Sequence, residues 1–401
     1  MPQETILNLK FSSDPRRGPD RSTAAGARIV GGVVAVLALT ATLAGCGFFS
    51  SGPTPAPPSG ATAHVSNSPA ITPLPSPTPM LIKSITLVAV VGQPKDATPA
   101  GLTWAGIRAA AGRIGATATL VEPTTRAAMG AEIDKAAETS LGVVVTVGPD
   151  AGDAVLLAAA AHSTTQFLEM SVVTPENGPA NVHGLLFDEA EAGYLAGYIA
   201  ASFSGSGKVA MVGDTAADSS TGNYSAGYRA GAAQGKPGTA VTIGYAGTAD
   251  APDKGRAAAA TLVKGGNDIM LTMPNLSGIG AARETCDRKA RFVAVGTDAW
   301  QVVPDARPCL IASVLDRYDA AVGNALLVLA AGQALPQQVM NDVSNDGVAV
   351  GDFHVDAPAG MKAGLAQVIA TLKNGPPRPS PVLATPTPSA ATSAAPKASG
   401  A

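Results

Sequence analysis

Short runs of apolar, β-branched residues recur along the middle of the chain and alternate with alanine-rich stretches. The strand-like runs lie at 85–91, 143–147, 208–213, 241–246, 268–273, 292–296 and 310–315. Helix-like stretches such as 103–115 and 255–266 separate most of them. Short buried strands that alternate with helices are typical of βαβ units, whose strands form parallel sheets. The pattern therefore predicts an α/β fold.

The predicted strands form two sets, each long enough for one doubly wound parallel sheet. The N lobe is expected at about 81–187 and the C lobe at about 205–312, within a body that extends over 81–373. Crossover segments are expected near 186–205, 313–320 and 345–356. Such sheets bind ligands outside the carboxyl ends of their strands, so the cleft between the lobes is the expected site.

The N-terminal residues 1–45 have the pattern of an export signal. The stretch 29–45, IVGGVVAVLALTATLAG, is uncharged and follows a basic segment. It ends in Leu43-Ala44-Gly45-Cys46, which resembles the lipobox of bacterial lipoproteins. The resemblance implies a mature chain that begins at a lipidated Cys46 and is anchored on the extracytoplasmic face of the cell membrane. An uncleaved signal anchor is the alternative.

Two flanking segments have compositions that do not support a packed core. Residues 46–80 are rich in Pro, Ser and Thr and are expected to form an extended spacer between membrane and body. Residues 374–401 have the same character and are expected to form a disordered tail.

Composition narrows the classes of function. The chain has 27 basic and 30 acidic residues and a net charge of −3, which argues against nucleic acid as a partner. Its three cysteines lack metal-ligand spacing and its four histidines are scattered, so neither a metal nor a cofactor is expected. Phosphate-binding loops and hydrolase motifs are also missing, so we expect no enzymatic activity.

A family resemblance lies in the segment from Gly184, GLLFDEAEAGYLAGYIAASFSGSGKVAMVGDTAADSSTGNYSAGYRAGA. It resembles the basic membrane protein family, the purine nucleoside receptor-like lipoproteins that serve ABC importers. That family has an FxxxEgxYLAGyxAA helix, a GKVGxVGG strand and an FxxGFxaGA helix in this order. The matching residues are Phe187, Glu191, Tyr194 to Gly197, Ala200, Ala201, Lys208 to Gly213, Tyr224, Gly227, Tyr228 and Gly231.

The resemblance covers about residues 82–352. It implies a type I periplasmic-binding-protein-like fold, a small-molecule solute as ligand, and an importer permease and ATPase as partners. Within the first helix of the motif, Tyr194, Leu195 and Tyr198 are spaced to form one buried stripe. We expect Gly197 and Ala200 to allow that helix close approach to the sheet.

The chain departs from the family at positions that bind ligand. Pro99 and Ala100 replace Phe and Asn, Asn275 and Leu276 replace glycines, Gly296 replaces an aspartate, Asp316 replaces a lysine, and Ser171 occupies the place of a carboxylate. Stacking is worth ~1–3 kcal/mol per base, and a hydrogen bond to a charged group about 1.5–3 kcal/mol. The resemblance therefore implies the family's fold without its purine-binding set.

Several polar residues close to predicted strand ends are candidate ligand contacts. Asp96, Asp150, Asp214 and Asp298 each follow a predicted strand closely, and helix N-capping is their alternative role. Thr98 opens the first helix, and Asn275, Ser277 and Gly278 form a turn that binds ligand or merely closes the loop. Trp300 is a stacking surface for a ring, or packs beneath a hinge.

The remaining cysteines, Cys286 and Cys309, flank the predicted strand 292–296 in the C lobe. Successive βα elements are usually neighbours in space, and exported proteins retain disulfides. We therefore predict a Cys286–Cys309 disulfide, with two separate buried thiols as the alternative.

These features support one main hypothesis of function and two others. The main hypothesis is a lipid-anchored solute-binding protein that delivers a small polar ligand, with nucleoside-like molecules among the candidates, to an ABC importer. The second is a ligand sensor or surface lipoprotein whose diverged pocket serves a partner protein. A hydrolase would need a nucleophile–base pair in the cleft.

Overall fold

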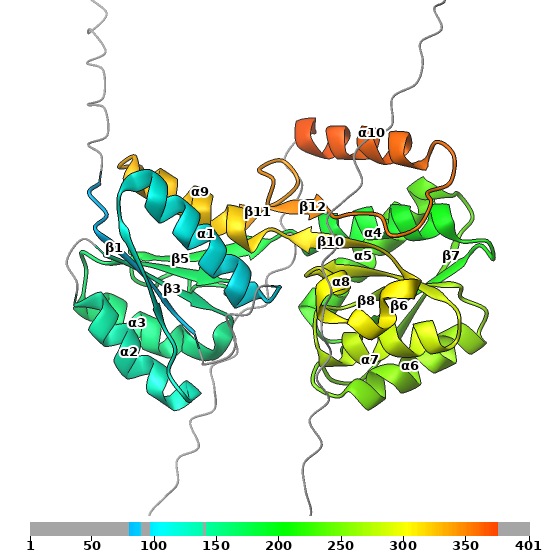
Figure 1. Ribbon diagram of the computed structural model, residues 1–401, viewed down its shortest axis with the longest axis horizontal. Helices are drawn as coiled ribbons and strands as arrows, with labels where there is room; N and C mark the ends of the chain where they lie inside the picture. Colours follow the sequence, from blue (N-terminus) through cyan, green and yellow to red (C-terminus); the bar gives the residue numbers. More distant parts are fainter. Residues whose placement is uncertain (1–79, 90–96, 139–141, 376–401) are drawn as a thin grey trace, which may run out of the picture. The chain divides into compact units, whose positions relative to one another are not determined.

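The computed structural model describes residues 80–89, 97–138 and 142–375, all within one compact unit. Two six-stranded sheets divide them into two lobes, as Figure 1 shows. The strand orders are β11-β5-β4-β3-β1-β2 and β12-β10-β9-β8-β6-β7. All pairings are parallel except that of β12 with β10. The predicted α/β class with parallel sheets is confirmed.

The first lobe is a sheet with helices on both faces. Its strands are β1 (Ser84–Val88), β2 (Thr117–Val121), β3 (Gly142–Val147), β4 (Gln166–Met170), β5 (Val182–Phe187) and β11 (Gln338–Asn341). Its helices are α1 (Pro99–Ile114), α2 (Met129–Ala137), α3 (Gly152–Ala161) and α9 (Tyr318–Ala330). Successive side chains of a strand face opposite sides, so Val143 and Val145 join the core under α1 and α9, and Val144 joins the core under α2 and α3.

The second lobe repeats this arrangement. Its strands are β6 (Lys208–Gly213), β7 (Ala240–Tyr245), β8 (Ile269–Thr272), β9 (Arg291–Gly296), β10 (Leu310–Asp316) and β12 (Val348–Val350). Its helices are α4 (Glu189–Phe203), α5 (Ser219–Gly235), α6 (Pro252–Lys264), α7 (Leu276–Asp287), α8 (Ala299–Val302) and α10 (Met361–Asn374). One face of the sheet packs against α4, α5 and α10 and the other against α6 and α7.

The chain passes between the lobes three times, after β5, after β10 and after β11. These crossings lie within 187–189, 316–318 and 341–348, so α4, which we had expected in a crossover segment, belongs to the second lobe. Hydrogen bonds tie the crossings together: Asp188 N donates to Asn341 O at 2.8 Å, and Arg317 N donates to Gly347 O at 2.8 Å. Glu191 of α4 accepts from Val343 N at 2.9 Å.

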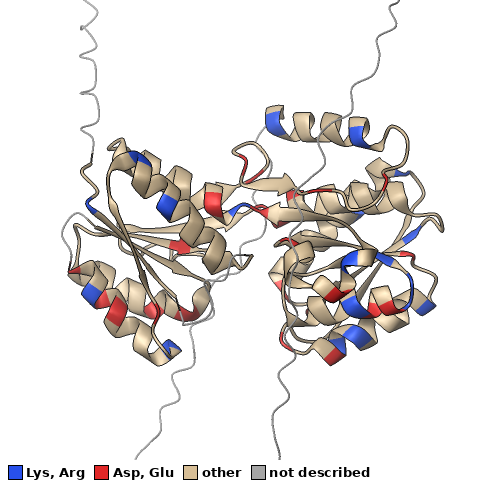
Figure 2. Ribbon diagram, viewed as in Figure 1, with Lys and Arg blue, Asp and Glu red and all other residues tan. Residues whose placement is uncertain are grey.

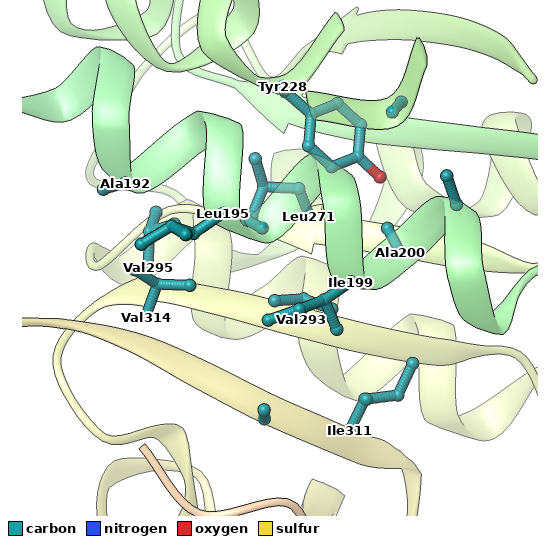
Figure 3. Packing of buried hydrophobic residues seen from close by; sticks show 14 of the residues in the cluster. Ala192, Leu195, Ile199, Ala200, Tyr228, Leu271, Val293, Val295, Ile311 and Val314 are labelled. Carbon is teal, nitrogen blue, oxygen red and sulfur yellow. The ribbon is translucent and has the colours of Figure 1, made fainter. Parts of the chain in front are cut away.

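The helix pair α4–α5 packs backbone against backbone, with small residues at the contact. An added Cβ at Gly197 would overlap the carbonyl oxygen of Tyr228, and one at Gly227 would overlap that of Ala190. Our expectation that Gly197 faces the sheet is therefore wrong, because Gly197 accommodates α5. The sheet contacts of α4 come from Leu195 and Ile199, which Figure 3 shows among the buried residues of this core.

The predicted stripe on α4 is also only partly correct. Leu195 is fully buried, whereas Tyr194 and Tyr198 are half-buried at the margin of the core. Tyr198 lies beside Gly364 of α10, where an added Cβ would overlap the tyrosine oxygen. The two tyrosines therefore fill the space between α4 and the C-terminal helix and do not face the sheet.

Candidate functional site

The main candidate site is a cavity of about 320 Å³ where the carboxyl ends of the two sheets meet. The first lobe contributes the ends of β4 and β5 and the start of α9, and the second lobe contributes the ends of β6 and β10 and the starts of α4, α5 and α7. Its lining includes the polar residues Glu189, Asp214, Asn275 and Asp316 and the aromatic residues Phe187 and Tyr318. This is the position that a parallel α/β fold predicts for a ligand.

Asp214 and Asn275 form a connected polar pair on one wall. Asp214 follows β6 directly, and Asn275 Nδ2 donates to both of its carboxylate oxygens, at 3.0 and 3.1 Å. Asn275 is also the N-cap of α7, because its Oδ1 accepts from Gly278 N at 2.9 Å. Burial raises the pKa of Asp214, and the hydrogen bond from Asn275 opposes that shift.

Glu189 lies at the first position of α4 and is held by the neighbouring helix α5. Ser220 Oγ donates to its Oε1 at 2.5 Å, and Asn223 Nδ2 donates to its Oε2 at 2.9 Å. Burial raises the pKa of Glu189, and the charges of Asp218 and Asp188 add to that effect. Both carboxylate oxygens of Glu189 therefore have partners within the protein.

Asp316 is the last residue of β10, and its hydrogen bonding differs from that of Asp214 and Glu189. The residue is only 6% exposed, and its Oδ1 is buried without a hydrogen-bond partner among the described residues. Burial and the charge of Glu189 raise its pKa well above the usual range. A buried oxygen without a hydrogen-bond partner lowers the stability of the folded protein. Asp316 is therefore a candidate for ligand binding, since it does not contribute a hydrogen bond from this oxygen to the fold.

An aromatic wall faces these carboxylates. The rings of Phe187 and Tyr318 lie 4.6 Å apart between centroids, tilted by 47°. The Tyr318 hydroxyl is 2.9 Å from Ser171 Oγ. Ser171 has φ of 59°, a left-handed conformation that is uncommon for serine. Non-glycine residues in this region occur often at functional sites, because the surrounding structure must hold the conformation.

Two smaller cavities adjoin the main one. An apolar cavity of about 160 Å³ lies between the start of α1 and helices α7 and α8, and shares Met273 and Pro274 with the main cavity. Another, of about 250 Å³, includes Asp298 and Arg317 and shares Asp316 with the main cavity. Arg317 is paired with Asp319 through two contacts of 2.9 Å.

The structure brings five of the predicted contacts to these cavities. Asp214 and Asn275 line the main cavity, Thr98 and Gly278 the apolar cavity, and Asp298 the remaining one. Thr98 and Asp298 are also N-caps, accepting from Gly101 N and Trp300 N respectively at 3.1 Å each. Capping and cavity lining coincide here because helices begin where strands end. Asp96 and Cys46 lie outside the described residues.

The other three predicted contacts line none of the three cavities. Ser277 is buried and donates to Thr248 O at 2.6 Å, which joins the start of α7 to the loop after β7. Asp150 is paired with Arg126 at 2.9 Å. Trp300 stacks on His354 at 4.0 Å between ring centroids, with the Arg307 guanidinium 5.0 Å from its ring centre.

Sequence reasoning missed Glu189, Phe187 and Tyr318 as site residues and treated Asp316 only as a lost lysine. Asp316 directly follows the predicted strand 310–315, so the rule that selected Asp214 and Asp298 would also have selected it. Glu189 and Phe187 were missed because β5 was not assigned. Its sequence VHGLLF contains a histidine and a glycine and lacks a clear strand pattern.

Cys286 and Cys309 form a disulfide in the structure, with their Cα atoms 5.4 Å apart. The bond joins the end of α7 to the start of β10 across β9. In the part of the chain that the structure describes, no group of three or more His, Cys, Asp or Glu side chains is arranged to hold a metal ion, and no helix has the length and apolar character to span a membrane.

Two sheets joined by three crossings, with a polar cavity at the carboxyl ends of their strands, define a two-lobed protein of the type I periplasmic-binding-protein class. The model of the Bmp family, described as ABC transporter substrate-binding protein PnrA-like, matches residues 85–359. The chain therefore belongs to that family, as the resemblance predicts.

Curated relatives match the chain over a shorter region. Basic membrane protein A of Borreliella afzelii is 31% identical over 127 residues, which are 32% of this chain and 39% of that protein. Basic membrane protein A1 of Borrelia garinii subsp. bavariensis is 30% identical over 130 residues, 32% of this chain and 38% of that protein. The chain thus spans less than two fifths of the length of these relatives.

Solved structures support the fold. An ABC transporter solute-binding protein from Conexibacter woesei has a TM-score of 0.60 at 21% identity, covering 75% of this chain and 99% of that one. A transcriptional activator of the comK gene from Bacillus halodurans has a TM-score of 0.62 at 15% identity, covering 73% of this chain and 98% of that one. These likenesses concern the fold alone.

Proposed function

We propose that the chain is the extracytoplasmic solute-binding protein of an ABC importer and binds a small polar ligand between its lobes. The observation that carries the proposal is the cavity of about 320 Å³, which residues of both lobes line at the carboxyl ends of their strands. A ligand held there contacts Asp214 and Asn275 on one side and Phe187 and Tyr318 on the other. It thereby stabilises the form in which the two lobes are close.

A thermal-shift screen tests this proposal. The panel contains nucleosides, free bases, sugars, amino acids and amines, because the family's purine contacts are replaced here. A ligand that binds only the folded state adds about 2.7 kcal/mol at 100 times its dissociation constant, which is easily measured. Replacing Leu186, a buried residue that lines the cavity, by Ala would disturb packing. Asn275→Ala is therefore the better site variant, and Asn374→Ala, at an exposed position, is the control. A shift that survives Asn275→Ala unchanged contradicts binding in this cavity.

Binding between lobes implies a closing motion about the three crossings. The crossings are short and mutually hydrogen-bonded, as expected of hinge segments that absorb a change in backbone angles. Small-angle X-ray scattering with a ligand from the screen should show a smaller radius of gyration than without it. Equal radii with saturating ligand contradict the two-lobe mechanism.

Delivery to an importer also requires a position at the membrane, which we assign to lipidation of Cys46. The lipobox-like LAGC sequence after an apolar stretch supports this proposal. Several acyl chains give stable anchoring where a single chain is marginal. Cys46→Ala should abolish incorporation of labelled fatty acid and release the protein from the membrane fraction. Unchanged labelling of the variant would exclude this anchor.

A further inference from the structure

The main cavity has an unbalanced charge. Its wall contains three carboxyl groups, those of Glu189, Asp214 and Asp316, and no lysine or arginine among the described residues. The nearby Arg317 is already engaged by Asp319. Lys and Arg gather on outlying helices such as α6, α7 and α10, as Figure 2 shows. No described cation therefore compensates the acidic cavity wall.

The three carboxyl groups differ in what they still need. Asn275 satisfies both oxygens of Asp214, and Ser220 and Asn223 satisfy those of Glu189. Asp316 lines the cavity and is 6% exposed, and its Oδ1 has no hydrogen-bond partner among the described residues. Buried polar atoms in folded proteins normally have a hydrogen-bond partner. The unpartnered Oδ1 of Asp316 therefore points to a ligand that donates a hydrogen bond, independently of the number of carboxyl groups in the wall.

The surroundings of Asp316 indicate what kind of donor fits. The rings of Phe187, Tyr224 and Tyr318 line the same cavity, and Tyr224 is 2% exposed. Aromatic faces attract cations, and more strongly where water is excluded. A carboxylate beside aromatic rings in a partly closed cavity is thus suited to an ammonium group that donates hydrogen bonds.

We propose that the cavity binds a small organic cation, whose protonated amine donates a hydrogen bond to Asp316 while Phe187 and Tyr318 contact its carbon skeleton. The proposal rests on the solute-binding function above and specifies its ligand class. A neutral polyol is less suitable, because it offers no positive charge to the three carboxyl groups of this partly closed site.

Isothermal titration calorimetry with matched probes tests the ligand class. The probes are putrescine, spermidine and tyramine, each compared with a neutral isostere in which hydroxyl or methyl groups replace the amines. We expect the amines to bind and the isosteres not to bind. Asp316→Asn keeps the shape of the side chain and should weaken amine binding roughly ten- to hundredfold, since a hydrogen bond to a charged group is lost. Exposed Asp352→Asn is the matched control and should leave binding unchanged.

A second measurement uses the ligand-free protein. Asp316→Asn removes a buried ionisable group that nothing described in the protein neutralises, so its melting temperature should be equal to or above that of the wild type. A marked drop would assign Asp316 a structural role and overturn the proposal. The comparison of wild-type amine and isostere binding is independent of how well this variant folds.

The remaining outcomes separate the two proposals. Binding of a nucleoside or sugar, with no response to any amine, overturns the cationic ligand class and leaves the solute-binding function intact. No binding by the amines or by any member of the neutral panel counts against both. Amine binding that Asp316→Asn leaves unchanged places the ammonium elsewhere and overturns the assigned contact.

Discussion

Glu169 gives the sharpest test of the energetics of this fold, because a carboxyl group is buried in the first sheet. It lies in β4, beside Thr146 of β3 and Gly184 of β5. The residue is 1% exposed, and its Oε1 has no hydrogen-bond partner among the described residues. Burial raises the pKa of Glu169 to about 7 from its usual 4.5.

The sign of the effect follows from proton binding. Between pH 4.5 and about 7 the folded state retains a proton on Glu169 that the unfolded state releases. The associated stability is therefore fully present below pH 4.5 and is lost as pH rises through about 7. At about 1.36 kcal/mol per pKa unit, the free energy of unfolding falls by roughly 3 kcal/mol over this range.

Glu169→Gln removes the ionisation and keeps the side-chain shape. In urea unfolding, the free energy of unfolding of the variant relative to the wild type should be about 2–3 kcal/mol more favourable near pH 8 than near pH 5. Glu138→Gln is the control, because Glu138 is exposed in the same lobe. An equal difference between Glu169→Gln and wild type at the two pH values would refute the reasoning, since a pH-independent effect cannot come from this carboxyl group.

Two further predictions concern packing and cross-linking in the second lobe. Gly227→Ala should destabilise the protein by about 1–3 kcal/mol in chemical unfolding, because the added methyl group overlaps the Ala190 carbonyl oxygen, whereas Gly222→Ala in the same helix meets no atom and should be neutral or stabilising. A large loss of stability for Gly222→Ala would contradict the expectation that an added methyl group at this position contacts no atom. Replacing Cys286 and Cys309 by serine should lower the free energy of unfolding by roughly 3 kcal/mol in the chain-entropy model, less any strain. Thiol titration of the unreduced, unfolded wild type checks the bond independently, and two reactive thiols from this pair would disprove it.

Strands with a continuous apolar run could be predicted from the sequence, and they include the edge strand β7. The edge strands β2, β11 and β12 and the internal strands β4 and β5 lack such a run and were not predicted. The central strand β6 matches the predicted run 208–213, because both of its faces are buried and every residue after Lys208 is apolar or small. The edge strand β2, TATLV, is largely exposed, and its sequence lacks the continuous apolar run that burial imposes. The short β11 and β12 follow long-range crossings, which local periodicity cannot reveal.

The candidate site was predictable only where a recognisable strand precedes its residue. Asp214 and Asn275 were found because β6 and β8 have clear apolar patterns. Tyr318 could not be found, because it begins α9 of the first lobe although the strand before it, β10, belongs to the second lobe. Only the crossing after β10 brings it to the cavity. Its contact with Ser171 joins residues 147 positions apart.

The residues that fix the packing of α4 against α5 differ from those that line the main cavity. The contact of α4 with α5 uses glycines that accept no larger side chain without backbone movement, so the helix pair that carries the family resemblance is strongly constrained. Asp316 instead ends a strand at the main cavity, and its Oδ1 has no hydrogen-bond partner among the described residues. We therefore expect a substitution at position 316 to act on ligand binding first, because the folded protein supplies no described partner that the substitution would remove.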